Sequence, residues 1–257
     1  MAFPKFKGKH LEKAILTPTE FLRYKKRIGD YPKQKVPEGI LLIFSRRFFK
    51  NILKHYKAKE IKNVYGALFS LKKANHKVGV RGKFGIGAPL SAIIVEDLIA
   101  LGSKKFIIVG TAGGISKKLK IGDIVVINKS IRDEGTSHHY LKNSKYVYPS
   151  KALTKKLVEL LQARKEKFYV APSWTIDAFY RETVKEMEHY AKEGVLTVEM
   201  EASALFAVGQ YRNVDVAAIV VVSDLHGSGK WRAKWRSSLV RNKLLKIFDI
   251  STEALSS

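Results

Sequence analysis

The feature that most constrains the fold of this 257-residue chain is the alternation of short, β-branched apolar runs with longer stretches of helical periodicity. The apolar runs predict strands at Ile40–Phe44, Lys77–Val80, Phe106–Val109, Asp123–Ile127, Phe168–Ala171 and Val214–Val222. The periodic stretches predict helices at Pro18–Arg27, Arg46–Tyr56, Pro89–Leu101, Lys151–Arg164, Tyr180–Lys192, Ala202–Tyr211 and Trp235–Ile250. Strands that alternate with helices predict an α/β fold in three layers, with helices on both faces of a central sheet.

The length and the composition of the chain suit a single domain. A chain of 257 residues is long enough to bury roughly three quarters of the surface that it exposes when unfolded. No low-complexity tract, internal repeat or hinge rich in proline and glycine divides it. We therefore expect one domain that spans residues 1–257.

The sequence also predicts a cytoplasmic location without a membrane partner. No run of about 18 apolar residues could span a bilayer, and Lys5, Lys7 and Lys9 interrupt any apolar core of a secretory signal. The chain has no cysteine, which excludes disulfides and thiolate chemistry. Together with the abundance of lysine, this composition is typical of a protein from a hot environment.

The charge of the chain favours an anionic ligand. Its 48 Lys and Arg residues against 23 Asp and Glu residues give a net charge of +25, and Trp231 and Trp235 lie among basic residues, a pattern that suits the stacking of nucleic-acid bases. The alternative for this segment is a helix with an apolar stripe, because Trp231, Trp235 and Leu239 recur at helical spacing. Since the excess charge is spread along the chain, we expect phosphate rather than a nucleic acid as the anion.

Two carboxylates flank one apolar residue in the segment Val195–Phe206, where Glu199 and Glu201 enclose Met200. Such a pair could hold the cis-diol of a ribose, because a carboxylate accepts hydrogen bonds from two hydroxyls and the intervening backbone N–H adds a third. The alternative is that both acids lie in the first turn of the next predicted helix, where the helix dipole favours negative charge. The segment alone leaves both interpretations open.

A glycine-rich segment, Gly110–Ile115, follows the predicted strand Phe106–Val109. Its glycines let backbone N–H groups approach a ligand, and Thr111 adds a hydroxyl. It is neither a Walker A loop nor a dinucleotide-binding fingerprint, because no Lys-Ser/Thr pair or Gly-x-Gly-x-x-Gly spacing completes it. This segment, the Glu-Met-Glu segment and Ser223-Asp224 are all expected at the carboxyl ends of strands, where α/β sheets bind their ligands.

In order and spacing, these separated motifs resemble the nucleoside phosphorylase and nucleosidase superfamily, in the branch of the uridine phosphorylases and the hexameric purine nucleoside phosphorylases. The motifs are Gly79–Leu90, Gly110–Ile115, Ile131–Tyr140, Val195–Phe206 and Ala217–Asp224. The resemblance runs from about Lys77 to Asp224. It implies a mixed, distorted central sheet with barrel-like character, and cleavage of an N-glycosidic bond without a metal or an organic cofactor.

The resemblance implies where the sugar and the phosphate are held. Glu201 is expected to bind the ribose hydroxyls, supported by the backbone of Met200 and by Glu199. Gly110 and Thr111 are expected to bind phosphate, which is a co-substrate in the phosphorylases of this family.

The resemblance also implies how the base is held and protonated. Phe179 corresponds to the aromatic residue that packs on the base, with Ala112 and Gly113 beside it. Asp224 is expected to protonate N7 of a purine as the glycosidic bond breaks, with an arginine about a dozen residues later, Arg236, to assist it. The alternatives are a core role for Phe179 and a capping or turn role for Asp224.

Two features favour a purine over uracil. Members of the family that act on purines carry Asp at the position of Asp224, whereas uridine phosphorylases carry Asn-Arg there. The glutamine and arginine with which uridine phosphorylases read uracil would align near Thr183 and Lys185, so that pair is missing. The place of the assisting arginine is flanked by Arg232 as well as by Arg236.

The phosphate site differs from the pattern of the family. Ile108 replaces the arginine usually found two residues before the glycine, and only Leu16–Glu20 represents the N-terminal Gly-Asp-Pro loop. Arg46 and Arg47, which follow the first predicted strand, are the candidates to neutralise phosphate, and Arg81 is another. In a chain this basic, each is also explained as a surface charge. An enzyme that uses water instead of phosphate would also explain why the phosphate-binding arginine is missing.

The family completes its sites across subunit contacts, which implies a dimer-based homo-oligomer, expected to be a hexamer. Some members bring an N-terminal histidine of a neighbouring subunit to the 5′-hydroxyl of the sugar, and His10 lies at a comparable position. His138 and His139 are adjacent and have no further ligands nearby at metal-binding spacing, so we expect no metal site.

The sequence therefore predicts a nucleoside phosphorylase that converts a purine nucleoside and phosphate into free base and ribose 1-phosphate. A uridine phosphorylase and a nucleosidase that uses water are the alternatives among enzymes. From another class, the alternative is a basic RNA-binding protein built on the same fold.

Overall fold

The computed structural model describes residue 6 and residues 8–226 and 231–256, and Lys5 and Lys7 lie outside this part. Its strands are β1 (Gly39–Leu42), β2 (Ala58–Ile61), β3 (Ala67–Leu71), β4 (Val78–Gly82), β5 (Lys105–Gly114), β6 (Ile124–Asp133), β7 (Tyr146–Val147), β8 (Phe168–Ile176), β9 (Thr197–Glu199), β10 (Asp215–Leu225) and β11 (Arg232–Ala233). Its α-helices are α1 (Pro18–Arg27), α2 (Arg46–His55), α3 (Ala88–Ala100), α4 (Ser137–Tyr140), α5 (Lys151–Ala163), α6 (Val184–Lys192), α7 (Ala202–Arg212) and α8 (Ser238–Ser256). Short 3-10 helices are η1 (Lys9–Leu11), η2 (Lys72–Ala74) and η3 (Phe179–Arg181).

Five strands close into a mixed barrel. Strand β10 pairs with β5 in parallel and with β6 in antiparallel orientation, β6 and β9 both pair in parallel with β8, and β9 pairs with β5 in antiparallel orientation. Strands β1, β4, β3 and β2 extend the sheet outward from β5. This closure confirms the predicted mixed, barrel-like sheet.

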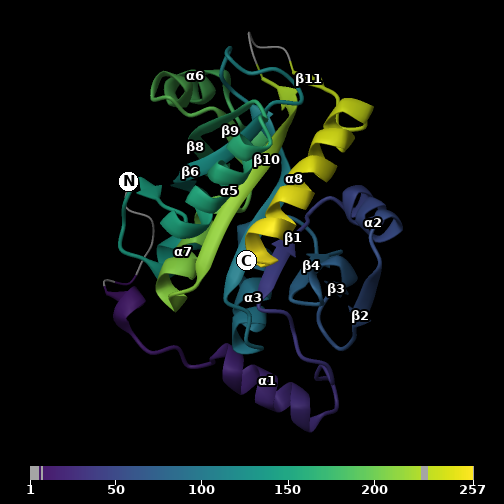
Figure 1. Ribbon diagram of the computed structural model, residues 1–257. Coiled ribbons are helices and arrows are strands. Elements are labelled where there is room, and N and C mark those ends of the chain that lie inside the picture. The colour runs from purple at the N-terminus through teal and green to yellow at the C-terminus, as the bar shows by residue number, and fades with distance from the viewer. Residues whose placement is uncertain (1–5, 7, 227–230, 257) are drawn as a thin grey trace.

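The central strands alternate their side chains between two apolar cores. Helices lie on both faces of the sheet (Figure 1), which confirms the three-layer arrangement. In β1, Ile40 and Leu42 point into the core that contains side chains of α3 and α7. Leu41 and the following Ile43 point into the core that contains side chains of α2, α5 and α8. Because side chains of a strand point alternately to opposite faces, a strand buried on both faces is apolar throughout.

Five of the seven predicted helices begin and end within two residues of the prediction, whereas the helix predicted at Trp235–Ile250 is α8 and that predicted at Tyr180–Lys192 is α6. The helix expected from Tyr180 begins at Val184, where the hydroxyl of Thr183 accepts a hydrogen bond from the backbone N–H of Glu186 at 3.4 Å. The preceding Phe179–Arg181 forms η3 instead. None of the described helices is long and apolar enough to cross a membrane.

The prediction of a helix with an apolar stripe around Trp231 and Trp235 is wrong. Between these residues, Arg232–Ala233 forms β11, which pairs in antiparallel orientation with the end of β10. Helix α8 begins only at Ser238. The rings of the two tryptophans meet edge to face at a centroid distance of 5.1 Å, and both remain about half exposed.

Candidate active site

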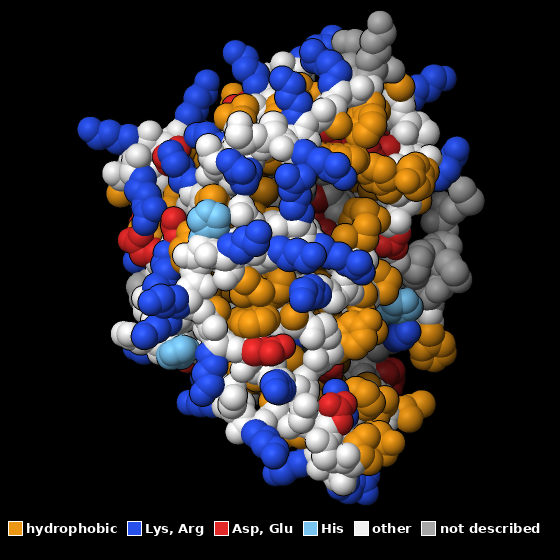
Figure 2. All heavy atoms as spheres, turned by 90° about the vertical axis from the view of Figure 1, so that its right-hand side faces the viewer, with side chains coloured by type: hydrophobic (Ala, Val, Ile, Leu, Met, Phe, Trp, Pro, Cys, Tyr) orange, Lys and Arg blue, Asp and Glu red, His pale blue; other side chains and the backbone are white. Residues whose placement is uncertain are grey.

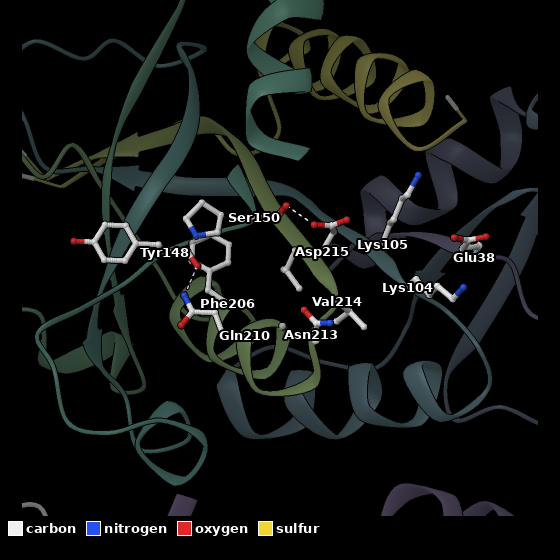
Figure 3. Close-up of a pocket in the computed structure, with 13 residues that line it drawn as sticks. Glu38, Lys104, Lys105, Tyr148, Ser150, Phe206, Gln210, Asn213, Val214 and Asp215 are labelled. Atoms are coloured by element: carbon white, nitrogen blue, oxygen red, sulfur yellow. Dashed lines mark hydrogen bonds between the residues drawn. The ribbon is translucent and has the colours of Figure 1, made fainter. Parts of the chain in front are cut away.

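One cleft of about 480 Å³ lies at the amino ends of β5 and β10 (Figure 3). Two of its polar side chains donate hydrogen bonds within the protein. The hydroxyl of Ser150 donates to the carboxylate of Asp215, and the amide of Gln210 donates to the carbonyl of Tyr148 at 2.9 Å. Since ligands of α/β sheets bind beyond the carboxyl ends of the strands, this cleft lies at the wrong end for the expected site.

A second pocket, of about 240 Å³, lies at the carboxyl ends of β5, β9 and β10. It brings together segments that are far apart in the sequence. The expected site residues that line it are Gly110, Thr111, Ala112, Gly113, Phe179, Glu199, Met200, Glu201 and Asp224. Because the ribose, phosphate and base candidates share one cavity, we take this pocket as the candidate active site.

The glycine-rich segment continues β5 and is not a turn, since Gly113 and Gly114 pair with both β9 and β10. Gly113 leaves room for a neighbouring ring: a Cβ there would lie 2.7 Å from Nε2 of His226. At Gly110 a Cβ would have no neighbouring atom within 4 Å, so this position opens into the pocket. The segment therefore forms a floor on which a ligand can approach the backbone closely.

Glu199 supports the start of helix α7. One carboxylate oxygen accepts hydrogen bonds from the backbone N–H groups of Glu201 and Ala202, at 2.8 and 2.7 Å, and the other accepts from the hydroxyl of Thr175 at 2.5 Å. Burial raises the pKa of Glu199, while these hydrogen bonds lower it. Of the two interpretations of this segment, the one in which an acid supports the start of a helix applies to Glu199. The residue also lines the pocket.

Glu201 has a different environment. Its side chain is buried, and one carboxylate oxygen accepts a hydrogen bond from the backbone N–H of Gly87 at 2.6 Å. Burial, followed by repulsion from Glu199, raises the pKa of Glu201 to about 8. A buried carboxylate is costly without partners, so hydroxyl donors of a ligand would stabilise its ionised form.

Asp224 is held by four donors. Its Oδ1 accepts from the hydroxyl of Ser223 at 2.7 Å and from the indole N–H of Trp235 at 2.9 Å. Its Oδ2 accepts from the indole N–H of Trp231 at 2.9 Å and lies 3.0 Å from Nε2 of His226. Burial alone would raise the pKa of Asp224, but the hydrogen bonds lower it to about 2.

His226, which the sequence analysis missed, lies between two carboxylates. Its Nε2 faces Asp224, and its Nδ1 lies 3.7 Å from a carboxylate oxygen of Glu182. The hydrogen bond to Asp224 raises the pKa of His226, burial lowers it, and the charge of Glu182 raises it again. The sequence Asp224-Leu225-His226 at the end of a strand could have indicated this pair, since residues two apart in a strand face the same side.

Arg46, Arg47 and Arg236 lie outside the residues that line the pocket. Arg46 and Arg47 are exposed and begin α2, directly after Ser45.

A groove of about 320 Å³ adjoins the pocket, with which it shares Ser45 and Trp235. Its basic lining residues are Arg47, Lys50, Lys54, Arg236 and Arg241, and none of its described lining residues is acidic. Lys and Arg side chains are spread over this face of the molecule (Figure 2).

Three further candidates lie away from the pocket. His10 belongs to η1, which contacts α4. Arg81 is buried in β4, with its guanidinium 5.8 Å from the ring of Phe84. In the segment Leu16–Glu20, Thr17 and Glu20 form a capping box that starts α1. Within the described residues, no group of three or more His, Asp or Glu side chains is arranged to hold a metal.

A family model described as the phosphorylase superfamily matches residues 39–251 of the chain. The match covers the whole barrel and all strands and helices that form the pocket. The chain therefore belongs to the phosphorylase superfamily, the family of purine and uridine phosphorylases, which are pentosyltransferases.

Named relatives divide between purine and pyrimidine enzymes. The guanosine phosphorylase of Halorubrum lacusprofundi is 32% identical over 138 residues, which is 54% of this chain and 57% of that protein. A DeoD-type purine nucleoside phosphorylase of Shewanella oneidensis is 31% identical over 202 residues, 76% of this chain and 83% of that protein. The uridine phosphorylase of Treponema pallidum is 34% identical over 149 residues, 54% of this chain and 58% of that protein.

A solved structure shares the fold. The purine nucleoside phosphorylase of Toxoplasma gondii, in complex with immucillin-H, superimposes with a TM-score of 0.75 and 20% sequence identity. The superposition covers 86% of this chain and 91% of that chain. At this identity the likeness shows the architecture alone.

The raised pKa of Glu201 predicts how stability depends on pH. Because the folded chain holds this proton up to about pH 8, whereas an ordinary carboxyl loses it near 4.5, the folded state loses stability from this group as pH rises between these values. Glu201→Gln should remove this decline, which is on the order of a few kcal/mol. Urea unfolding at pH 5 and pH 9 measures the change. The exposed Glu188→Gln serves as control, and equal declines in all three proteins would contradict the prediction.

The open space at Gly110 predicts that Gly110→Ala separates folding from ligand binding. The added Cβ meets no protein atom within 4 Å, so the thermal unfolding midpoint should stay near that of the wild type. Activity on nucleosides should fall on the order of tenfold or more, because the Cβ occupies space for the ligand. Gly209→Ala is the matched control: its Cβ would lie 2.6 Å from Val216, so it should lower the midpoint instead. Full activity in Gly110→Ala would exclude Gly110 from the ligand site.

Proposed function

We propose that this chain is a purine nucleoside phosphorylase, which converts a purine nucleoside and inorganic phosphate into free base and ribose 1-phosphate. The observation that carries the proposal is the shared pocket of the β5 glycine segment, Glu201 and Asp224. Membership of the phosphorylase superfamily supports a nucleoside and phosphate as the substrates. We propose that no metal or organic cofactor takes part.

Glu201 is proposed to bind the 2′- and 3′-hydroxyls of the ribose. The two hydroxyls donate to the carboxylate and offset the cost of its burial. As the glycosidic bond breaks, C1′ acquires positive charge, and a carboxylate held in a dry pocket stabilises this charge. Glu199 holds the start of α7 and the backbone of Glu201 in place. The backbone of Met200 lines the same part of the pocket.

The base is proposed to lie between Phe179 and the Asp224 side of the pocket. Phe179 is 38% exposed and lines the pocket, so its ring is available for stacking on a base. Ala112 and Gly113 line the pocket beside it. The hydroxyl of Thr183, near which the uracil-reading glutamine of uridine phosphorylases would align, accepts a hydrogen bond at the start of α6. This use of Thr183 supports a purine rather than uracil as the base.

Phosphate is proposed to bind between Thr111 and Ser45, both of which line the pocket. The hydroxyl of Ser45 already caps α2, where it accepts from the backbone N–H of Phe48 at 3.2 Å. The remaining N–H groups at this helix start and the positive end of its dipole favour an anion. Arg46 and Arg47, the first two residues of α2, are proposed to supply the charge that Ile108 lacks.

A nucleosidase is the second candidate, and one observation favours it. Ile108, which occupies the place of the phosphate-binding arginine, lines the pocket and is almost fully buried. An apolar side chain in this place would suit an enzyme that uses water and binds no phosphate.

The assembly is proposed to be a dimer-based oligomer, a hexamer, in which His10 of a neighbouring subunit reaches the 5′-hydroxyl of the sugar. Within one chain, η1 contacts α4 and His10 does not line the pocket. We also propose a cytoplasmic location and no nucleic-acid partner.

One assay tests the proposed function directly. Purified protein is incubated with inosine, guanosine, adenosine, methylthioadenosine and uridine, each with and without phosphate, and base release is followed. We expect release from a purine nucleoside that requires phosphate, and a loss of roughly 2–4 kcal/mol of transition-state stabilisation in Glu201→Gln. Equal release without phosphate would identify a nucleosidase, and preferential cleavage of uridine would overturn the purine assignment. Tight binding of RNA without base release would favour the non-enzymatic alternative.

The basic groove predicts a specific effect on phosphate. Arg47→Ala removes a cation at the junction of the groove with Ser45, so the KM for phosphate should rise several-fold more than the KM for the nucleoside. Added salt should weaken phosphate binding in the wild type more than in the variant. Lys72→Ala, which removes an exposed charge in η2, is the control for net charge. Equal effects of the two substitutions would mean that Arg47 acts on phosphate only through the net positive charge of the protein and does not bind it.

A further inference from the structure

The base end of the pocket contains a row of three ionisable groups: Asp224, His226 and Glu182. The side chains of the two carboxylates are about 5% and 6% exposed, and that of His226 is 13% exposed. All three residues line the pocket. Because these three groups interact, their arrangement decides which of them can donate a proton to the leaving base.

Asp224 is poorly placed to donate a proton. Each of its oxygens already accepts two hydrogen bonds, from Ser223 and Trp235 at Oδ1 and from His226 and Trp231 at Oδ2. Indole N–H groups can only donate, so they require an acceptor and favour the ionised carboxylate. A protonated Asp224 could keep all four contacts only if His226 or Ser223 accepted the proton of the carboxyl instead of donating. The four donors therefore keep Asp224 as an anion.

His226 has the opposite arrangement. Its Nε2 is held by Asp224 at 3.0 Å, whereas its Nδ1 is 3.7 Å from Glu182, too far for a hydrogen bond. The facing oxygen of Glu182 is buried and has no hydrogen-bond partner among the described residues. The missing side chain of Gly113 gives the imidazole its space. An imidazolium in this place has one N–H fixed and one N–H free for a ligand.

We propose that His226, and not Asp224, donates the proton to N7 of the departing purine, and that Asp224 is a positioning residue that holds the imidazolium. This inference rests on the proposed function. In the step, the bond between C1′ and N9 breaks and its electron pair moves into the purine ring. N7 takes the proton from Nδ1 of His226, and a phosphate oxygen forms the new bond to C1′. The proton that phosphate loses restores the imidazolium through solvent.

Glu182 is a second positioning residue in this arrangement. Its charge attracts the imidazolium from the Nδ1 side before a substrate binds, and a purine N7 would then become the acceptor for that N–H. Burial raises the pKa of Glu182, the charge of His226 lowers it, and repulsion from Asp224 and then from Glu186, on α6, raises it further. The groups that control the charge of His226 are therefore Asp224, Glu182 and, through Glu182, Glu186.

The test compares nucleosides that need the proton with nucleosides that do not. A purine nucleoside methylated at N7 already carries the positive charge that protonation would create, so its base leaves without an acid. Wild type, His226→Gln, His226→Ala and Asp224→Asn are assayed at pH 6 on guanosine and 7-methylguanosine, or on the matching pair for the purine that the enzyme accepts. Thermal unfolding checks that each variant is folded. The substitution His226→Ala also leaves room for the methyl group on N7.

We expect both His226 variants to lose on the order of 10²–10⁴ in kcat/KM on the unmethylated nucleoside and less than about tenfold on the methylated one, at least in His226→Ala. The wild-type rate on the unmethylated nucleoside should fall as pH rises through the pKa of His226, which the hydrogen bond to Asp224 raises above the ordinary value, and the variants should lack this fall. Equal losses on both nucleosides, or a selective loss only in Asp224→Asn, would overturn the proposal. If the wild type releases no base from any purine nucleoside, the proposed function itself fails, which is a separate result.

Discussion

The site depends on the double pairing of β10. This strand pairs with β5 on one side and with β6 on the other, which closes the barrel. Its register places Asp224 opposite Gly113, so that the proposed base end of the pocket lies beside the glycine floor. The register shifts between Val222 and Asp224, and such a bulge redirects the side chains that follow it. The pairing that closes the barrel therefore also assembles the site.

The strongest apolar patterns predicted the fold well. Strands β1, β5 and β10 are buried on both faces, and their continuous apolar runs make them recognisable. Strands β2, β3, β7, β9 and β11 were not predicted, and β2 and β9 illustrate two physical reasons. Strand β2 is short and exposes Lys59 and Glu60, so it lacks an apolar signal. Strand β9 has only three residues, and its place depends on β5 and β8.

The candidate site was predicted only where one segment carries the chemistry. The Glu-Met-Glu segment was singled out by its local pattern and Asp224 by the resemblance to the family, and both line the pocket. The partners of Asp224 were not found, since the spacing of Trp231 and Trp235 also fits a helix. Their true role depends on β11, which turns the chain back along β10 and brings both indoles to one carboxylate. Contacts of this kind are set by tertiary pairing, which spacing cannot reveal.

The two indole contacts to Asp224 have an optical consequence. The chain has three tryptophans. Trp174 is buried and donates to Asp133 at 2.9 Å, whereas Trp231 and Trp235 are about half exposed beside the pocket. Two of the three tryptophans thus donate to the same carboxylate. We expect the tryptophan emission of the unlabelled protein to change when a ligand occupies the Asp224 side of the pocket.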